Sequence, residues 1–473
     1  MNSPLPDRNS AGRGTWLPLV ATCLGTFLLL VYATIVTVAL PRIAGDLHAD
    51  FGALQWIVDV YTLALAGLLL GMGSLGDTLG RKRLYLLGLA VFTLATLACG
   101  AAPDAPLLIA ARAVQGIAGA AMFATLLPLI GLTYSGRDRA RAFAVWGAVA
   151  GAAAGVGNVA GGMLTQFLSW RWLFHGAVPL CLATLLLSWK VLAADARTPA
   201  RIDWPGIAAF TLAATGVTFG FVRGGERGWG DPVTLLGFAV GAAALLVFVL
   251  VERASAHPML PLALFRTRAF NGLLIASGTY YPAAFGFLPV LSLRLQHHDG
   301  LGAFATSLVL TAQPLAFFVT SALAGSALHR VPARWAIAGG CLLVGIGDLT
   351  LLAAQTGSSW PVLLPGLVLT GAGAGLVSPV LPATAMAAAP SAHSGVAAAA
   401  ANGARQLGLA LGIALLGTAY AAAGLSAVFL LAGALALLGA LLTVLLGRPP
   451  RPAEPLRPVM RHGAPMAGQD VRG

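Results

Sequence analysis

Long apolar runs alternate along the chain with short segments that hold most of its polar residues. Each run is about twenty residues long, which is the length that an α-helix needs to cross about 30 Å of hydrocarbon. The pattern predicts fourteen membrane-spanning helices, at residues 16–40, 53–73, 83–101, 106–131, 140–163, 172–192, 204–222, 232–251, 270–292, 303–326, 334–354, 361–385, 397–420 and 424–447. We therefore expect an all-α polytopic membrane protein.

The composition agrees with this prediction. Of the 473 residues, 58% are hydrophobic and 9% are charged, and the mean hydropathy is +0.85, far from the averages of soluble domains. The net charge of +12 would suit a nucleic-acid partner, but the basic residues are scattered between apolar runs and form no continuous face. Membrane orientation explains basic loops more simply, so we expect no binding of nucleic acid.

The basic residues between the runs predict how the chain crosses the membrane. Lys and Arg gather in cytoplasmic loops, and with a cytoplasmic N-terminus most of the 28 Lys and Arg residues fall on that side. The connections on the other side hold only Arg42, Arg171, Arg223, Arg227 and Arg294. This asymmetry predicts an even number of spans, with both termini in the cytoplasm.

A weak internal repeat divides the chain into two halves. Two features of the first part recur at nearly the same offset in the second. They are GSLGDTLGRK at 73–82 with GSALHRVPAR at 325–334, and Gly116 and Pro128 with Gly371 and Pro382. Related six-helix halves are a transporter architecture. The expected organisation is a cytoplasmic tail at 1–15, a first half at 16–192, an inserted helix pair with its loops at 193–252, a second half at 253–447 and a disordered cytoplasmic tail at 448–473.

Four charged side chains lie well inside the expected spans: Asp59, Arg112, Asp348 and Arg405. At 1.5 Å per helical residue, Asp59 and Arg112 share a depth of about 10 Å below the outer ends of their helices, so the two could pair. A buried charge costs several kcal/mol and is by default functional. Because a carboxyl group can bind and release a proton as its access to water alternates, Asp59 is the candidate proton-coupling residue. The alternative, which stays open for Asp348 above all, is a helix-end residue that reaches water.

The fifth span carries glycines at helical spacing around one amide side chain. These residues are Gly147, Gly151, Gly155, Gly157, Asn158, Gly161 and Gly162. Glycines at i, i+4 and i+8 clear one helix face so that a neighbouring helix can pack closely. Ordinary close packing and a gating role explain this pattern equally well.

Two further patterns are weaker evidence for a binding site. Tyr281 and Phe285 share a helix face and could line an aromatic pocket or belong to the core. The run His297, His298 and Asp299 has no further ligands at fixed spacing, so a solvated loop explains it better than a metal site. No GxxxxGK[ST] loop or HExxH motif occurs, so we expect no enzyme activity, no ATP dependence and no metal or cofactor.

Several stretches resemble the major facilitator superfamily. The turn at 73–82 resembles the signature between its second and third helices, 112–121 resembles its fourth-helix motif, and 147–162 resembles its fifth-helix antiporter motif. NGARQLG at 402–408 and the inserted pair resemble the fourteen-span drug:proton antiporter branch. The resemblance implies the major facilitator fold, with two six-helix halves around a central cavity.

Two further stretches look like the first two helices of the multidrug and quaternary-ammonium exporters in this branch, namely TIVTVALPRIAGDL at 34–47 and QWIVDVYTLALAG at 55–67. Asp59 would then correspond to the second-helix acid of those pumps. Tyr32 stands where many relatives carry an acid, and Asn158 stands where the antiporter motif has Pro.

The resemblance also implies roles for individual residues. The gate on the cytoplasmic side would comprise Gly73, Asp77, Gly80, Arg81 and Lys82. Arg112 would take part in proton coupling with Asp59. Candidates for the substrate cavity are Tyr32, Gln115, Asp348, Asn402 and Arg405.

The sequence thus predicts a monomeric exporter of small amphipathic organic molecules (drugs, antibiotics or organic cations) in the cytoplasmic membrane of a bacterium. Its partners would be the substrate, protons and the lipid bilayer, and the proton gradient would supply the driving force. Two alternatives stay open. One is a specific metabolite or antibiotic exporter, or a weakly coupled uniporter, and the other is a membrane receptor or scaffold that keeps the fold without transport.

Overall fold

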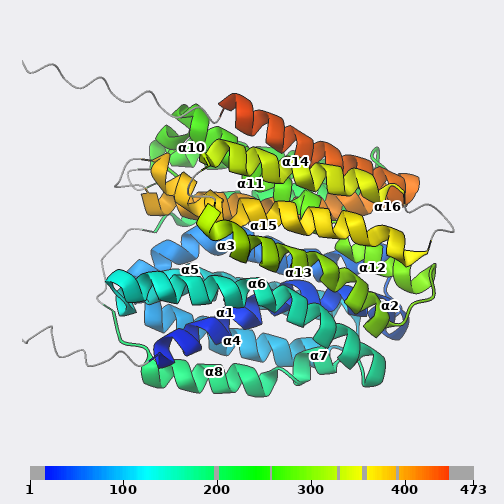
Figure 1. The fold of residues 1–473 in the computed structure, drawn as a ribbon, viewed down its shortest axis with the longest axis horizontal. Helices are drawn as coiled ribbons and strands as arrows, with labels where there is room; N and C mark the ends of the chain where they lie inside the picture. Colours follow the sequence, from blue (N-terminus) through cyan, green and yellow to red (C-terminus); the bar gives the residue numbers. More distant parts are fainter. Residues whose placement is uncertain are drawn as a thin grey trace, which may run out of the picture.

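The computed structural model describes residues 16–195, 202–255, 258–327, 331–353, 359–389 and 394–446. These residues form helices and their connections, and they include no strand. Figure 1 shows the long helices side by side along one axis. The expected tails at 1–15 and 448–473 lie outside the described residues, as does part of the repeat at 325–334.

The first half of the chain forms eight α-helices and one 3₁₀ helix. They are α1 (Leu17–Thr34), η1 (Ile35–Ala39), α2 (Leu40–Leu47), α3 (Phe51–Leu79), α4 (Arg81–Ala101), α5 (Ala105–Thr133), α6 (Gly136–Phe167), α7 (Trp172–His175) and α8 (Val178–Val191). Asp50 and Asp104 accept hydrogen bonds from backbone N–H groups at the starts of α3 and α5, so carboxylates satisfy helix ends that would otherwise be unpaired.

The inserted pair and the second half follow. They comprise α9 (Trp204–Arg227), α10 (Pro232–Ala254), η2 (Leu262–Arg266), α11 (Arg268–Phe285), α12 (Leu288–His297), α13 (Ala303–Ala327), α14 (Ala333–Leu351), η4 (Trp360–Leu363), α15 (Leu364–Ala387) and α16 (Ser394–Leu446).

Three expected spans are interrupted, each close to a proline. The first span changes to the 3₁₀ helix η1 just before Pro41, the sixth is divided between α7 and α8 before Pro179, and the ninth is divided between α11 and α12 before Pro289. Each proline lies at the second position of the helix that follows the break, where its missing N–H leaves no helical bond unmade. The prolines therefore start new helices at these positions.

Thirteen helical runs in the described part of the chain are long and apolar enough to cross a membrane. The last of them, Val396–Leu446, contains both the thirteenth and the fourteenth expected spans. Gly424 interrupts it with a φ of 76°, a value that glycine adopts readily. Gly408 and Gly439, on either side of this break, both lie against α11, so α16 folds back on itself as two antiparallel segments.

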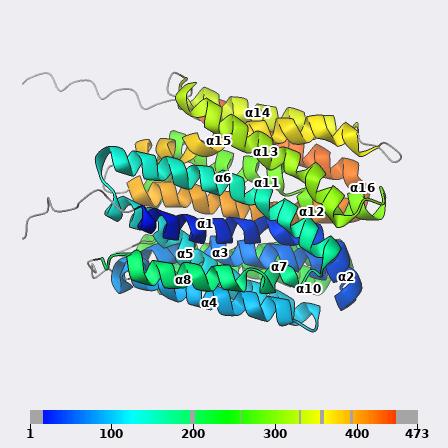
Figure 2. The same ribbon diagram turned by 60° about the horizontal axis from the view of Figure 1, so that its bottom comes forward.

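The two halves meet along two helix pairs. Helix α6 packs against α13, and α3 packs against the first segment of α16; Figure 2 shows α6 beside α13. The inserted helix α9 packs against α10, α3 and α16. Helix α9 of the inserted pair therefore covers the contact between α3 and α16 from one side.

The internal repeat has a structural counterpart. A Cβ at Gly116 of α5 would collide with the backbone carbonyl of Tyr61 in α3, and a Cβ at Gly371 of α15 would collide with that of Gln313 in α13. Each half thus brings its second and fourth helices together over a glycine, as small residues permit in membrane helices.

Candidate functional site

The halves are joined at one end of the bundle. Helix α3 passes into α4 at Arg81 and Lys82, and we call this end of the bundle the basic end. We call the opposite end the far end. Helices α2 and α12 lie together at the far end (Figure 1). The hydrogen bonds between the halves in the described part of the chain lie toward the far end. Gln55 Nε2 donates to the carbonyls of Ile413 and Ala414 (3.5 and 3.4 Å), Phe304 N donates to Gln166 Oε1 (2.8 Å), and Gln296 Nε2 donates to Val38 O (2.9 Å).

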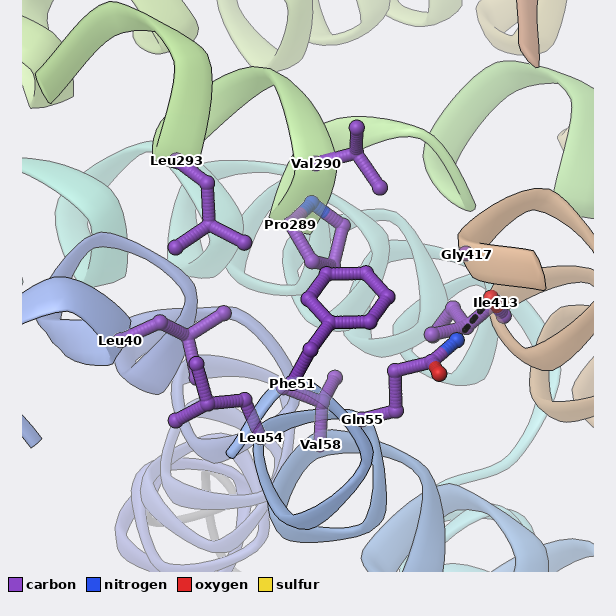
Figure 3. Close-up of a pocket in the computed structure, with 10 residues that line it drawn as sticks. All are labelled: Leu40, Phe51, Leu54, Gln55, Val58, Pro289, Val290, Leu293, Ile413 and Gly417. Carbon is purple, nitrogen blue, oxygen red and sulfur yellow. Dashed lines mark hydrogen bonds between the residues drawn. The ribbon is translucent and has the colours of Figure 1, made fainter. Parts of the chain in front are cut away.

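A small hollow between the halves lies beside these bonds. Its wall is apolar except for Gln55, and Figure 3 shows Phe51 beneath Pro289 at its centre. The lining residues come from α2, α3, α12 and α16: Leu40, Phe51, Leu54, Gln55, Val58, Pro289, Val290, Leu293, Ile413 and Gly417. Apolar side chains from both halves therefore close the far end.

Arg112 of α5 is fully buried within the first half, where it bonds to three acceptors. Its Nε donates to Ile57 O (3.1 Å), and its Nη1 donates to Tyr32 O (3.2 Å) and Gln115 Oε1 (2.7 Å). The guanidinium also lies 4.4 Å from the centre of the Tyr61 ring. Arg112 thus ties α1, α3 and α5 together through backbone carbonyls and an aromatic face.

Tyr32 and Gln115, two candidates for the substrate cavity, belong to this same network. The Tyr32 hydroxyl donates to Leu173 O (2.8 Å) and Gln115 Nε2 donates to Thr96 Oγ1 (2.8 Å), and neither side chain is exposed. Both residues support Arg112, and neither lines an open cavity in this conformation.

Asp59 is also fully buried, and neither carboxylate oxygen has a hydrogen-bond partner. The pairing with Arg112 considered from the sequence is not formed. Both residues do lie at a similar depth, since Arg112 bonds to Ile57, but two residues of helix correspond to about 200° of rotation. Tyr61 and Asp59 therefore point to opposite sides of α3, with Arg112 on the side of Tyr61.

The expected gate residues interact within the first half. Gly80, with a φ of 94°, ends α3, and Arg81 then donates to Asp77 Oδ1 from Nε (3.0 Å) and Nη2 (2.8 Å). Lys82 Nζ donates to the carbonyls of Trp189 and Leu192 at the end of α8. Gly73 has open space where a Cβ would be.

Sequence reasoning missed Asp195, which lies just beyond α8. Its carboxylate accepts hydrogen bonds from the backbone N–H groups of Arg81 (2.9 Å) and Lys82 (3.2 Å), so it satisfies the exposed start of α4. The sequence did show an acidic residue just after the basic end of a predicted helix. It could not show the partner of this residue, because the start of α4 is more than a hundred residues away in sequence. This contact fixes the chain after α8 to the expected gate.

The glycines of α6 face two neighbours. A Cβ at Gly157 would lie 3.0 Å from Thr34 Oγ1, and one at Gly161 would lie 2.8 Å from the Ile35 carbonyl, both in the α1–η1 segment. A Cβ at Gly151 would lie 3.1 Å from the Phe318 ring of α13 in the other half, whereas Gly147 has nothing within 4 Å. Gly155 and Gly162 also face α13, and Asn158 is buried.

We expect Gly161→Ala to destabilise the protein and Gly147→Ala to be tolerated. The added methyl at residue 161 meets backbone rather than a flexible side chain, and such overpacking costs about 1–3 kcal/mol. At residue 147 the methyl meets nothing, and Ala is the better helix former. Thermal unfolding of the two purified variants in detergent measures the difference, and equal midpoints would contradict this account of α6.

Arg405 of α16 forms a smaller cluster in the second half. Its Nη2 donates to Asn402 Oδ1 (2.7 Å), its Nη1 contacts Ser378 Oγ (3.4 Å), and its guanidinium lies 4.8 Å from the centre of the Tyr281 ring. The Tyr281 and Phe285 rings are 4.8 Å apart. Arg405 keeps donor capacity, because its buried Nε has no partner.

Asp348 of α14 lies apart from this cluster. It is fully buried, with no hydrogen-bond partner for either oxygen, so it is not the water-exposed helix-end residue that the sequence left open. Its neighbours Gly345 and Gly347 pack against α16 and α15 respectively. The structure therefore places Asp348 inside the second half.

Comparison with known proteins decides the family. The model of the Major Facilitator Superfamily matches residues 22–267 and 273–472. The chain belongs to this superfamily. Together with the membrane-spanning helices, this membership makes the protein a multi-pass membrane transporter.

Relatives within the major facilitator superfamily include named export and resistance proteins. The chain is 37% identical over 412 residues to the cephamycin export protein of Amycolatopsis lactamdurans, covering 84% of this chain and 83% of that protein. It is 35% identical over 427 residues to a puromycin resistance protein of Streptomyces alboniger, covering 88% of this chain and 84% of that protein. It is 32% identical over 408 residues to a multidrug resistance protein of Mycobacterium tuberculosis, covering 86% of this chain and 76% of that protein.

Solved structures of similar fold belong to more distant transporters. An auto-inhibited peptide transporter of the POT family gives a TM-score of 0.71 at 14% identity, covering 93% of this chain and 98% of that one. A human organic anion transporter gives 0.65 at 18% identity, covering 90% and 99%. At these identities the likeness shows the major facilitator fold and nothing about substrate.

Proposed function

We propose that this transporter exports small amphipathic organic molecules, among them drugs, antibiotics and organic cations, in exchange for protons. The observation that carries the proton coupling is Asp59, a carboxylate buried without a partner beside the contact between the two halves. The named activities of the relatives, which concern cephamycin, puromycin and multiple drugs, support export as the direction.

The orientation follows from the distribution of charge. If the basic end faces the cytoplasm, as the positive-inside rule requires, both termini are cytoplasmic and the protein lies in the cytoplasmic membrane of a bacterium. The far end then faces outward, and the hydrogen bonds of Gln55, Gln166 and Gln296 close the outer side. In the proposed transport cycle, a conformation closed on the outer side would be the one that admits substrate from the cytoplasm.

Transport would proceed by rocking the halves about the pairs α3–α16 and α6–α13. To open the far end, the chain has to break a few hydrogen bonds and separate the apolar residues around Phe51 and Pro289 (Figure 3). On the cytoplasmic side, the ion pair of Asp77 with Arg81 (2.8 Å) would shape the surface that closes against the other half.

The cluster around Arg405 supplies polar and aromatic groups suited to amphipathic substrates. Tyr281 and Phe285 offer ring faces, Asn402 offers an amide, and Arg405 has an unused donor. A mixture of apolar surface with a few polar groups is typical of small-molecule sites. Phe285 also approaches Phe317 of α13, with ring centres 6.2 Å apart. Helices α11, α13 and α16 therefore all contribute side chains to this cluster.

Export is tested by drug accumulation in bacterial cells that express the protein. We expect lower accumulation of ethidium than in cells with the empty vector, and we expect a protonophore to remove the difference because it collapses the proton gradient. A panel that adds puromycin and a β-lactam separates a broad exporter from a specific one. Unchanged accumulation of every compound would contradict export and favour a receptor or scaffold.

A specific antibiotic exporter is the second candidate function. Two of the relatives are named for a single antibiotic or antibiotic class. In the same panel, this candidate predicts reduced accumulation of one chemical class only, with no change for ethidium.

A further inference from the structure

Two polar side chains without partners are buried in the contact of three helices. Neither Asp59 Oδ1 nor Oδ2 has a hydrogen-bond partner, and the same is true of Thr218 Oγ1 in the inserted helix α9. Both residues have an exposed fraction of 0%. Buried polar groups are nearly always paired, so each such exception calls for a physical explanation.

The register of α9 against α3 places these residues at the same level. The two helices run in opposite directions, and four contacts define their alignment. They are Gly71 with Ile207, Gly67 with Thr211, Trp56 with Phe219, and Gly52 with Glu226. The alignment brings Asp59 opposite Thr218 and Phe219.

Thr218 lies on the face of α9 that points into the contact with α3 and α16. Ala214, one turn before it, packs with Leu63 of α3 and Ala410 of α16. Phe221, at i+3, accepts a hydrogen bond at its carbonyl from Thr418 Oγ1 of α16 (2.9 Å). Residues at i−4 and i+3 share a helix face with residue i, so the Thr218 side chain points toward both helices.

Asp59 lies on the matching face of α3. Gln55, at i−4, donates to carbonyls of α16, and Leu63, at i+4, belongs to the cluster with Ala214 and Ala410. The two orphaned groups therefore share one depth and one three-helix contact, between α3, α9 and α16. Thr218 thus brings a hydroxyl group from the inserted helix α9 to the level of Asp59, and no hydrogen bond joins the two side chains in this conformation.

We propose that Thr218 is a positioning residue for the proton site at Asp59, and that the inserted helix pair thereby takes part in energy coupling. This inference rests on the proposed proton-coupled export. A hydroxyl can donate to an ionised carboxylate and accept from a protonated one, so Thr218 can partner Asp59 in both states. It would hold the carboxylate in place while the proton is bound and released.

Charged groups on the surrounding helices lie away from this contact. On α9, Arg223 pairs with Asp231 (2.9 Å), and Glu226 and Arg227 lie in the last turn at the far end. On α16, the Arg405 guanidinium lies over the Tyr281 ring. On α5, Arg112 lies on the opposite side of α3. We therefore take the hydroxyl of Thr218, and no charged group, as the partner of Asp59.

Substitution of Thr218 tests the proposal through the pH profile of transport. Val keeps the shape and removes the hydroxyl, whereas Ser keeps the hydroxyl. A hydroxyl that donates to the ionised carboxylate during the transport cycle would lower the pKa of Asp59. Thr218→Val should therefore shift the pH profile of drug:proton exchange in proteoliposomes toward alkaline values by about one pH unit. Thr218→Ser should follow the wild type.

Thr215→Val is the matched control. The Thr215 hydroxyl donates to Thr211 O in its own helix (2.8 Å), so this variant removes from α9 a hydroxyl that already has a partner. Its pH profile should equal that of the wild type. A Thr218→Val profile that coincides with the wild type, or an equal shift in Thr215→Val, would overturn the proposal.

A second measurement does not depend on transport. Dicyclohexylcarbodiimide modifies protonated buried carboxyl groups, so peptide mass spectrometry of the purified protein after labelling at different pH values reports the protonation of Asp59 directly. The labelling midpoint should shift in Thr218→Val and not in Thr218→Ser; identical midpoints would refute the role of Thr218. If the wild-type protein exported nothing, the proposed function would fail, while this labelling would still decide the contact between Thr218 and Asp59.

Discussion

Asp59→Asn is expected to abolish proton-driven drug transport while leaving the protein folded in the membrane. The side chain keeps its size and loses its ability to take up a proton. Because the carboxylate has no hydrogen-bond partner, its replacement breaks no network. Vesicles with an imposed pH gradient measure the effect, and we expect uptake at the level of vesicles without the protein.

The same variant should still move substrate down its own concentration gradient. Asp59 lies in the contact of α3 with α9 and α16. The cluster proposed to bind substrate lies between α11 and α16, where the Arg405 guanidinium faces the Tyr281 ring. The proposed coupling site and the proposed substrate site are therefore different groups of residues. Counterflow of labelled substrate in the absence of a pH gradient measures the uncoupled movement.

Two variants control this experiment. Asp59→Glu keeps an ionisable carboxyl and should retain part of the proton-driven transport. Asp104→Asn makes the same change at an exposed helix start, where residue 104 accepts a hydrogen bond from Leu107 N (2.8 Å), and it should behave as the wild type. Full proton-driven transport by Asp59→Asn would eliminate Asp59 as the coupling residue.

Arg112→Ala should both destabilise the protein and stop transport, because Arg112 joins three helices of the first half. The substitution deprives the acceptors on Ile57, Tyr32 and Gln115 of their donor. Hydrogen bonds to charged groups contribute about 1.5–3 kcal/mol each, so their combined loss exceeds a typical single mutation. It also removes the cation that faces Tyr61.

Arg405→Ala is the matched comparison for Arg112→Ala. Arg405 makes one short hydrogen bond, to Asn402, a longer contact with Ser378, and contacts with the side chains of Tyr280 and Tyr281. Within the described part of the chain it bonds to no backbone carbonyl of another helix, so its loss should lower the unfolding temperature less than the loss of Arg112. Arg112→Lys provides a folded intermediate, since one ammonium group cannot reach all three acceptors. Thermal unfolding in detergent ranks the variants, and an unfolding temperature of Arg112→Ala equal to or above that of Arg405→Ala would contradict this assignment.

The positions of the membrane spans could be predicted from the sequence because they depend on local composition. A run of about twenty apolar residues has to satisfy its backbone within the hydrocarbon, and a helix does so without partners. The breaks within spans were harder to predict. Proline marked the places, but whether the chain bends, continues or reverses there, as α16 does at Gly424, depends on the helices packed around it.

The candidate site could be predicted in part. Depth along a helix follows from counting residues, and Asp59 and Arg112 do lie at similar depth. The face of the helix was not predicted, because every side of α3 is apolar and the sequence does not show which neighbour covers which side. For this reason the pairing of Asp59 with Arg112 could be considered from the sequence and was excluded only by the structure.

By itself, the sequence determined that this protein crosses the membrane many times as helices, that its basic residues gather between spans, and that Asp59 and Arg112 lie buried. These properties follow from composition and spacing along a single segment. Only the tertiary structure decided that Arg112 bonds to the carbonyls of Tyr32 and Ile57, that Asp195 caps α4, and that α9 packs against α3. Such contacts join residues far apart in the chain, and they depend on how complete helices pack rather than on the residues that surround either partner.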